Sequence, residues 1–184
     1  MSSILFVTTN QDKYNKVRIN LEPYGIKITH QSWEMSEIQS SDGEQIVRDK
    51  AQQAYAKFKK PVLVNDDTWS IPALRGFPST GMKLCNDFLL AKDWLRLMKG
   101  VADKRVFLIS FYAYHDGRSI KVVTSKHERY FLEKPQGKHP DAPSLEVISE
   151  KGSDISIAQQ ISRGRVIDTN SSDFWKQLAG LLSG

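Results

Sequence analysis

Three side chains able to bind phosphate follow the first apolar segment of the chain. Residues 4–7 (Ile-Leu-Phe-Val) are apolar and strand-sized, and Thr8, Asn10 and Lys13 come after them, where a segment with helical spacing begins. Backbone N–H groups at the start of a helix are unpaired and carry partial positive charge, so they stabilise a phosphate. Thr8 and Asn10 would add neutral donors, and Lys13 a full charge. An ordinary helix N-cap with a solvated lysine gives the same pattern, and spacing alone favours that simpler interpretation.

A second polar cluster, residues 65–68 (Asn-Asp-Asp-Thr), follows the apolar run at residues 62–64. In α/β proteins, ligands usually lie beyond the end of a buried strand. Carboxylates there suit Mg²⁺, which is typically held by one or two protein carboxylates together with substrate phosphates. Adjacent aspartates are also typical of an Asx turn that binds no metal. The residues alone support the metal site and the turn about equally.

Lys50 lies beside an apolar stripe formed by Val47, Ala51 and Ala54, in a segment with helical spacing. A lysine in that place usually extends past the core and reaches water with its ammonium group. The alternative is that Lys50 reaches a phosphate from the sheet side. The spacing by itself favours the first interpretation.

The elements predicted to position these side chains alternate between strands and helices. Ser41 begins a capping-box pattern with Glu44, and Asp116-Gly117 predicts a tight hairpin turn. Strand–helix alternation combined with a hairpin predicts an α/β fold with a mixed sheet flanked by helices. Strands are expected at residues 4–7, 26–29, 62–64, 106–114, 119–124 and 147–148, and helices around residues 14–21, 44–58, 88–98 and 174–182.

The composition is that of an ordinary globular protein, and we expect a single domain over residues 1–184. No apolar run reaches the roughly 18 residues of a membrane span, and no signal peptide is recognisable. Cys85 is the only cysteine, which excludes an intrachain disulfide and favours a reducing cytoplasm. The net charge of +5 weakly supports an anionic ligand. Because the basic residues are scattered, we expect no nucleic acid as partner, and because no apolar run is long enough, we expect no membrane.

Several segments, in order along nearly the whole chain, resemble the motifs of the inosine triphosphate pyrophosphatase (HAM1) family. Each motif is weak alone, but their common order makes the resemblance specific. The family's fold is an elongated mixed sheet in two lobes with a central cleft, and its members are commonly homodimers. The resemblance therefore implies that architecture and that assembly. The matching segments are residues 8–13, 36–39, 49–51, 61–74, 76–83, 152–154 and 161–165.

The resemblance also implies an activity and a set of site residues. The expected reaction is hydrolysis of a nucleoside triphosphate, particularly a non-canonical purine nucleotide, to monophosphate and pyrophosphate with Mg²⁺ as cofactor. The metal is assigned to Glu37 and Asp66, and Asp66 is also the expected catalytic residue, orienting or deprotonating water. The expected substrate contacts, with the lysines on the phosphates, are Thr8, Asn10, Lys13, Lys50, Asp67, Lys83, Ser162 and Arg163.

The chain departs from the family pattern in both halves of the site. Asn65 replaces the glutamate before the catalytic aspartate, Asp67 stands where the family has Thr or Ser, and Lys16 replaces a glutamate. The family's purine-reading Phe-Gly-(Tyr/Trp)-Asp loop falls at residues 142–145 (Ala-Pro-Ser-Leu), and Ser162 takes the place of a base-reading histidine. The phosphate and metal half is therefore largely retained, whereas the nucleobase half is rewritten.

These departures leave three alternatives open. The first is a pyrophosphatase for a different modified nucleotide. The second is a nucleotide-binding protein that has lost catalysis because Asn65 weakens the metal site. The third, a nucleic-acid binder that uses exposed Trp33 and Trp69, is the least favoured, because no dense basic stripe with interleaved aromatic residues is present.

Overall fold

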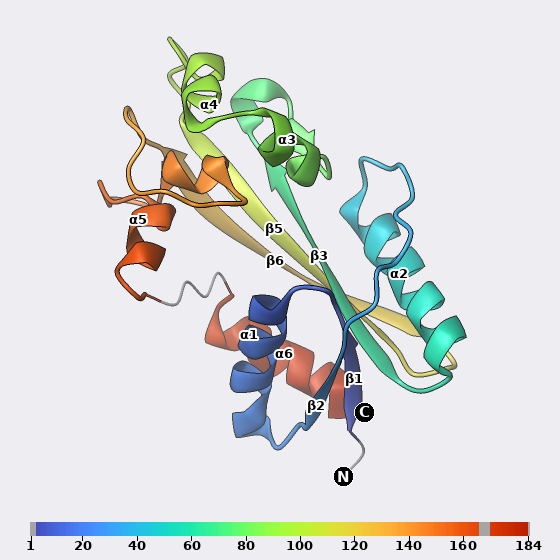
Figure 1. The fold of residues 1–184 in the computed structure, drawn as a ribbon. Coiled ribbons are helices and arrows are strands. Elements are labelled where there is room, and N and C mark those ends of the chain that lie inside the picture. Colours follow the sequence, from blue (N-terminus) through green and yellow to red (C-terminus); the bar gives the residue numbers. More distant parts are fainter. Residues whose placement is uncertain (1–2, 166–169, 184) are drawn as a thin grey trace. The chain divides into compact units, whose positions relative to one another are not determined.

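The computed structural model describes residues 3–165 and 170–183, and its central feature is a seven-stranded mixed sheet (Figure 1). The strand order is β2-β1-β3-β5-β6-β7, with the short strand β4 paired to β3. The pairs β1–β2 and β1–β3 are parallel, whereas β3–β4 and β6–β7 are antiparallel. The strands are β1 (Ile4–Val7), β2 (Ile28–Gln31), β3 (Val62–Ser70), β4 (Pro78–Ser79), β5 (Arg105–His115), β6 (Ile120–Phe131) and β7 (Ile148–Ser149).

Helices connect and cover these strands. The first three strands are joined by α1 (Gln11–Leu21) and α2 (Gly43–Phe58), as parallel pairing requires. The predicted α/β class, with a mixed sheet flanked by helices, is confirmed. Within the described ranges, no helix is long and apolar enough to cross a membrane. The other helices are α3 (Met82–Phe88), α4 (Ala91–Leu97), α5 (Ile157–Ser162) and α6 (Ser172–Ser183), with 3-10 turns η1 (Glu22–Tyr24), η2 (Pro72–Leu74) and η3 (Pro143–Glu146).

The described residues divide into two compact units. The first comprises the described parts of Met1–Asp67, Ser110–Ser125 and Asn170–Gly184, and the second those of Thr68–Ile109 and Lys126–Thr169. The second unit has its own core, in which Trp94 of α4 is fully buried among side chains of neighbouring strands and turns. Thr8, Asn10 and Lys13 belong to the first unit, as do the adjacent aspartates Asp66 and Asp67.

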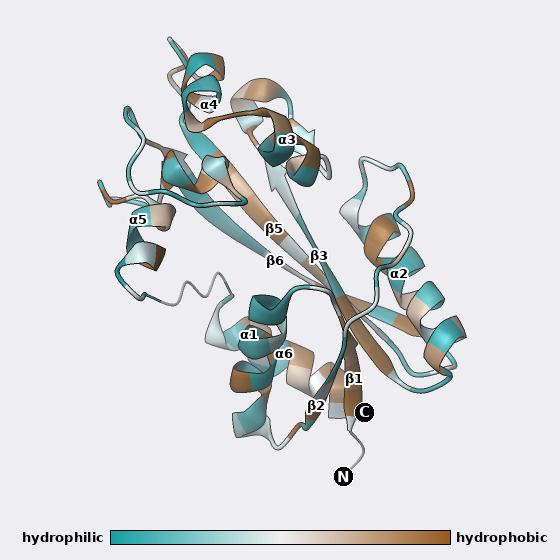
Figure 2. Ribbon diagram, in the orientation of Figure 1, coloured by the Kyte–Doolittle hydropathy of each residue, from teal (hydrophilic) through white to brown (hydrophobic). Residues whose placement is uncertain are grey.

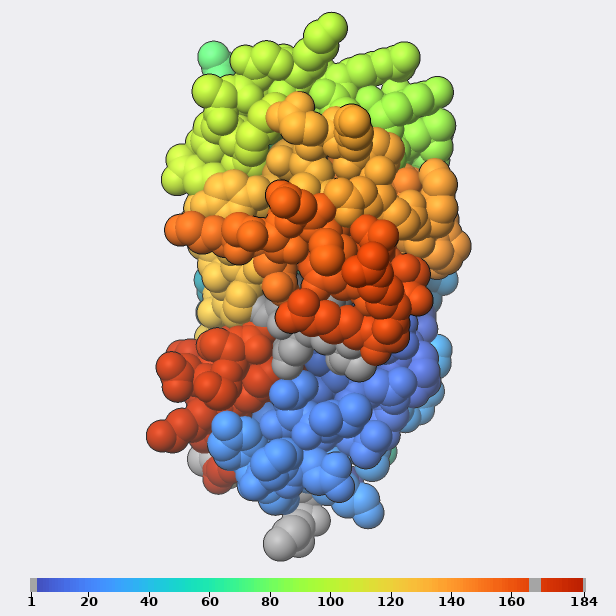
Figure 3. Space-filling model, turned by 90° about the vertical axis from the view of Figure 1, so that its left-hand side faces the viewer, coloured from blue at the N-terminus to red at the C-terminus, as the bar shows by residue number. Residues whose placement is uncertain are grey.

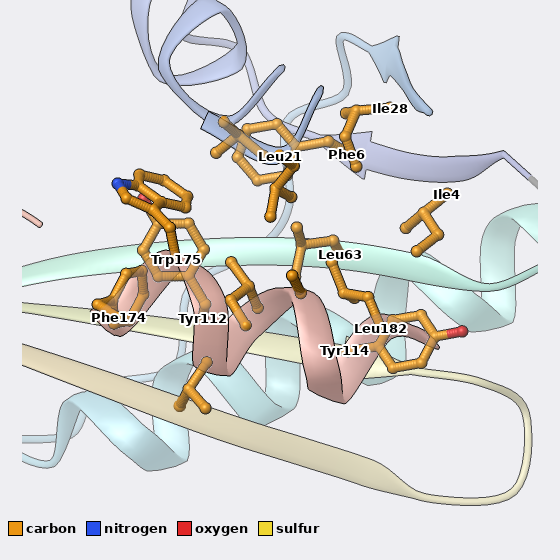
Figure 4. Close-up of a cluster of buried hydrophobic side chains, with 14 residues drawn as sticks. Ile4, Phe6, Leu21, Ile28, Leu63, Tyr112, Tyr114, Phe174, Trp175 and Leu182 are labelled. Atoms are coloured by element: carbon orange, nitrogen blue, oxygen red, sulfur yellow. The ribbon is translucent and has the colours of Figure 1, made fainter. Parts of the chain in front are cut away.

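In the first unit, α1 and α6 lie side by side on one face of the sheet (Figures 1 and 3). Both helices place apolar side chains at helical spacing toward the strands, and the aromatic rings of Phe174, Trp175 and Tyr112 pack on one another (Figure 4). This burial joins the carboxy-terminal helix to the first strands of the chain. The cluster includes Phe6, Val17, Leu21, Leu63, Tyr112, Phe174, Trp175, Leu178 and Leu182.

The opposite face of the same strands packs against α2. Val47, Ala51 and Ala54 are completely buried there, as the predicted stripe required. Val62 and Val64 of β3 belong to this cluster, whereas Leu63 faces α1 and α6. Successive side chains of a strand point to opposite faces, so β3 alternates between the two helical layers. β1 and the first part of β3 are hydrophobic along their length (Figure 2), as expected of strands buried on both faces.

Strand β3 does not end after Val64, so the Asx-turn alternative for residues 65–68 is wrong. The strand continues through the polar residues to Ser70, and its last residues pair with β4. The polar segment remains extended because its carboxylates meet lysines and a serine hydroxyl from other elements. These partners lie far away in the sequence, so local turn preference does not decide the backbone conformation.

Three further boundaries differ from the sequence predictions. β2 begins at Ile28 rather than at residue 26. The N-cap of α2 is Asp42 rather than Ser41, because the Asp42 carboxylate accepts hydrogen bonds from the N–H groups of Glu44 and Gln45. The helix predicted from Phe88 to Met98 is not continuous. Helix α3 ends at Phe88, and a separate helix, α4, begins at Ala91.

Gly117, in the turn between β5 and β6, supports a prediction about stability. Its φ is +98°, and an added Cβ would collide with the Tyr55 side chain of α2. Gly25 also has a positive φ, +72°, but open space surrounds its Cβ position. We expect Gly25→Ala to cost about 1 kcal/mol of unfolding free energy, and Gly117→Ala about 2–4 kcal/mol, because steric overlap adds to backbone strain. Urea unfolding of the two variants provides the comparison, and equal losses would contradict a close packing of Tyr55 on this turn.

Candidate functional site

The loop between β1 and α1 is built as a helix cap. The Asn10 side-chain oxygen accepts a hydrogen bond from the Lys13 N–H at 3.0 Å, and the Thr8 hydroxyl oxygen accepts one from the Asn10 N–H at 3.1 Å. The helix cap of the simpler interpretation is therefore confirmed, but its solvated lysine is not, because Lys13 pairs with Asp67. The cap leaves the lysine side chain to act elsewhere, because only the backbone N–H of Lys13 takes part in it.

The Lys13 ammonium contacts Asp67 of β3. The distance from Lys13 Nζ to Asp67 Oδ2 is 2.7 Å, and the Ser110 hydroxyl of β5 donates to Asp67 Oδ1 at 2.6 Å. Burial alone would raise the pKa of the Asp67 carboxyl, but the charges of Lys13 and Lys16 and the hydrogen bonds from Lys13 and Ser110 lower it to about 2. Asp67 is therefore a fixed negative charge at any ordinary pH.

Lys50 of α2 lies between two carboxylates. Its Nζ is 2.5 Å from Asp66 Oδ1 and 2.6 Å from Glu37 Oε2. The side chains of Lys50 and Asp66 are only 12% and 13% exposed, so the interpretation that Lys50 extends past the core to water is wrong. Burial opposes the ammonium form, but Asp66 and Glu37 outweigh it and raise the pKa of Lys50. Burial raises the pKa of Asp66 despite the nearby Lys50 charge.

The two adjacent aspartates serve different faces of the sheet. Because side chains alternate along β3, Asp66 faces Lys50 on the α2 side and Asp67 faces Lys13 on the α1 side. On the α2 side, Glu37 and Asp66 meet one ammonium group, leaving an excess of negative charge. On the α1 side, two lysines act on the single carboxylate of Asp67, leaving an excess of positive charge.

Asn65 lies on the same face as Asp67, because it is two residues away in the strand. Its Nδ2 group donates toward Asp67 Oδ2 at 3.4 Å, and its buried Oδ1 has no hydrogen-bond partner among the residues that the structure describes. Exchanging the amide oxygen and nitrogen would bring two oxygens together, so the Asp67 carboxylate fixes the orientation of the amide. The neutral residue at position 65 therefore does not remove charge from the pair formed by Glu37 and Asp66.

Ser110 is a contact that sequence reasoning missed. It lies in the middle of an otherwise apolar strand and is 5% exposed. A serine among aliphatic and aromatic residues is the signal that could have identified it, since a buried polar group needs a hydrogen-bond partner.

The remaining predicted substrate contacts belong to the second unit, and each is described by its own neighbours. Lys83 of α3 is 92% exposed and forms an ion pair with Asp87 at 3.2 Å. The Ser162 hydroxyl, at the end of α5, donates to the Gln159 carbonyl at 2.9 Å, and Arg163 is the C-cap of that helix. Roles for these three residues in substrate binding stay predictions.

The segment that replaces the family's purine loop forms η3 in the second unit. Ser144 is fully buried, and Leu145 packs against the core cluster that contains Trp94. The Ser144 N–H donates to the Asn86 side chain at 3.4 Å. These residues thus contribute to the core of their own unit, and none carries an aromatic ring or a charge.

A hollow of about 480 Å³ lies in the second unit, next to the end of β6. The Gly152-Ser153-Asp154 motif lines it together with Tyr130 and Glu150. In the part of the chain that the structure describes, no group of three or more His, Cys, Asp or Glu side chains gathers as a metal-binding set. Two carboxylates, those of Glu37 and Asp66, do meet around the Lys50 ammonium.

Comparison with known proteins places these features in a family. The model of the Ham1 family matches residues 4–140. A dITP/XTP pyrophosphatase of Saccharolobus solfataricus is 30% identical over 115 residues, which cover 62% of this chain and 60% of that protein. A dITP/XTP pyrophosphatase of Methanosarcina mazei is 32% identical over 114 residues, and the match covers 62% of each chain. The chain thus matches only 60% and 62% of the lengths of these relatives.

Solved structures agree in fold. A HAM1 protein from Coxiella burnetii superposes with a TM-score of 0.76 at 15% identity, covering 100% of this chain and 99% of that one. The Ham1 protein of Staphylococcus aureus gives a TM-score of 0.73 at 15% identity, with 97% and 98% covered. At such identity the superposition establishes the fold alone. The match of the family model to most of the sequence identifies this chain as a member of the Ham1 family.

Proposed function

We propose that this protein is a nucleoside triphosphate pyrophosphatase that converts non-canonical purine nucleotides to monophosphate and pyrophosphate. The observation that carries the proposal is the buried Lys50, held between Glu37 and Asp66 at 2.6 and 2.5 Å. An ion pair with an additional carboxylate is negative overall and suits a divalent cation. The positive excess near Lys13 suits phosphate oxygens. The family and the names of its dITP/XTP pyrophosphatases support the substrate class.

A divalent metal fits Glu37 and Asp66, because their oxygens already surround a cationic group at short distance. Two carboxylates supply hard oxygen ligands, and substrate phosphates would complete the set. We propose Mg²⁺ as the ion. Its contribution would be to neutralise charge on the phosphate oxygens during the reaction.

The residues of the chain then have separate tasks. Lys13 and Lys50 would hold the phosphates, helped by Thr8 and Asn10 at the start of α1. Asp66 would accept a proton from the water that attacks the α-phosphorus. A P–O bond to that water forms, the bond to the bridging oxygen breaks, and pyrophosphate leaves with the electron pair. Asp67 would position Lys13, and we propose Lys83, Ser162 and Arg163 as further substrate contacts on the strength of the motifs.

We further propose that the protein acts as a homodimer in the cytoplasm. Exposed apolar side chains on the second unit support association, since Leu84, Phe88 and Leu90 are 63%, 77% and 54% exposed. The single cysteine fits a reducing compartment.

The rival in which Asn65 abolishes catalysis has less support. The residue belongs to the face that carries Asp67, and its amide interacts there. The metal-binding pair on the α2 face keeps both of its carboxylates. Loss of charge at position 65 therefore gives no reason to expect an inactive metal site.

Asp66→Asn tests the catalytic role. The substitution keeps the shape of the side chain but removes its ability to accept a proton, so we expect pyrophosphate release to fall by about 10²-fold or more. Lys50 keeps Glu37 as partner, and we expect little loss of folding stability. The assay is pyrophosphate release at saturating Mg²⁺, with Asp103→Asn, an exposed pair with Arg105, as the control variant. Turnover close to that of the parent would remove Asp66 from the mechanism.

Lys50→Ala tests phosphate binding. We expect loss of triphosphate affinity by about 10-fold or more, since a charge-assisted hydrogen bond contributes roughly 1.5–3 kcal/mol. Monophosphate affinity should change much less, because fewer phosphates are present to meet the charge. Isothermal titration with both nucleotides and Mg²⁺ measures the two losses, with Lys13→Ala as the parallel case. Exposed Lys92 supplies the control variant Lys92→Ala. Equal losses for both nucleotides would mean that Lys50 serves only the fold.

The rewritten base-reading segment leads to a prediction about selectivity. Residues 142–145 offer neither a ring for stacking nor a charged acceptor, and Ser144 is buried in the core of its unit. We expect a preference for inosine or xanthosine triphosphate over guanosine triphosphate of less than about 100-fold, because apolar contacts discriminate weakly. The measurement is kcat/KM for the three nucleotides under one set of conditions. A larger preference would reveal a purine-reading pocket built from other residues.

A further inference from the structure

His30 of β2 binds the backbone of the phosphate motif directly. Its Nε2 lies 2.8 Å from the carbonyl oxygen of Thr8, the first residue of the loop between β1 and α1. A carbonyl oxygen only accepts hydrogen bonds, so Nε2 carries the proton and donates. The neighbouring Gln31 carbonyl accepts from the Thr8 N–H at 3.1 Å. Both backbone groups of Thr8 are thus bound to the end of β2.

The same imidazole also contacts the first turn of α1. The Tyr14 ring stacks on it with a centroid distance of 4.6 Å and an interplanar angle of 14°. Tyr14 follows Lys13 in the sequence, so the stack lies one residue from the ammonium that pairs with Asp67. His30 therefore joins both ends of the loop, through a hydrogen bond at Thr8 and through ring stacking at Tyr14.

Within the loop, two further hydrogen bonds connect Thr8 to Asn10 and Asn10 to Lys13. The Thr8 hydroxyl accepts from the Asn10 N–H, and the Asn10 side chain accepts from the Lys13 N–H. The direction of the N–H groups at the start of α1 follows from this chain of contacts. A site whose donors already point in the right direction loses less conformational entropy when an anion binds. A residue that fixes Thr8 and Tyr14 thus acts on phosphate affinity without touching phosphate.

We propose that His30 is a positioning residue of the phosphate-binding loop, acting through its Nε2–H bond to Thr8 and its stack on Tyr14. The inference rests on the proposed function, because it assumes that the loop receives a triphosphate. It adds a residue outside the motif, on a different strand, to the determinants of substrate affinity.

The chain provides a matched control in a second tyrosine–histidine stack. Tyr55 and His115 stack with a centroid distance of 4.3 Å and an angle of 17°, and His115 Nδ1 accepts from the Gly117 N–H at 3.0 Å. This pair joins α2 to the turn after β5 and makes no contact with Thr8 or α1 among the bonds and stacks described. Loss of either imidazole removes one hydrogen bond and alters one stack, so His115→Phe controls for the general effect of removing such an imidazole.

The experiment compares His30→Phe, His30→Gln and His115→Phe. Phenylalanine keeps a ring for Tyr14 but has no N–H, whereas glutamine can return an N–H near the Thr8 carbonyl. Titration with inorganic tripolyphosphate and Mg²⁺ gives the affinity, and inosine triphosphate hydrolysis gives kcat and KM. We expect His30→Phe to weaken tripolyphosphate binding about 5- to 10-fold. KM should rise by a similar factor with kcat within about twofold, because the loop acts on ground state and transition state alike.

The glutamine variant should recover most of the affinity, and His115→Phe should bind like the parent. Unchanged affinity in His30→Phe would overturn the inference, as would an equal loss in His115→Phe, which would mean general destabilisation. A parent protein that binds neither tripolyphosphate nor nucleotide would instead overturn the proposed function, and this inference with it. A parent that binds and hydrolyses while His30→Phe is unaffected contradicts the positioning role alone.

Discussion

The alternation of side chains along β3 is the constraint on which the rest of the site depends. Two carboxylates on adjacent residues would repel each other strongly if they shared one surface. In an extended strand they point to opposite faces, and each meets a lysine from the helix that covers its own face. A shift of β3 by one residue would exchange the two aspartates between the faces. It would also move Leu63 from the core under α1 and α6 to the core under α2. A single register of β3 therefore places both its apolar side chains and its two carboxylates.

The ion pairs add to the apolar packing of α1 and α2 against the central strand. Each helix has a short buried stripe, and each carries one lysine onto the central strand. Lys50 is deeply placed, and a buried ammonium without a partner would be costly. Asp66 and Glu37 both contact the ammonium and offset this cost, and Glu37 still meets it if Asp66 loses its charge. Chemistry and packing are thus coupled at Lys50, whereas Lys13 is more exposed and pairs with a single carboxylate.

The sequence predicted structure correctly where the residue pattern within one segment determines which side chains are buried. The apolar residues of β1 and the stripe of Val47, Ala51 and Ala54 were predicted correctly, because periodicity alone determines burial there. The continuation of β3 past Val64 was not predictable in this way. Its polar residues are tolerated in a strand because of Lys13, Lys50 and Ser110, which come from three distant segments. His30 was not predictable for the same reason. Its partners are the Thr8 carbonyl, 22 positions away, and the Tyr14 ring, 16 positions away.

The departures from the family motifs at positions 16, 65 and 67 can be explained by the face of β3 on which each acts. Position 65 and position 67 share the face toward α1, so the charge lost where Asn65 replaces a glutamate returns on the same face as Asp67. That carboxylate in turn receives the influence of Lys16, which replaces another glutamate, and of Lys13. A glutamate at position 16 would repel Asp67, whereas a lysine stabilises its ionised form. The three substitutions therefore form one electrostatic arrangement around Asp67. The α2 face keeps Glu37, Lys50 and Asp66, which match the family motifs, so the departures at positions 16, 65 and 67 all fall on the face of β3 toward α1.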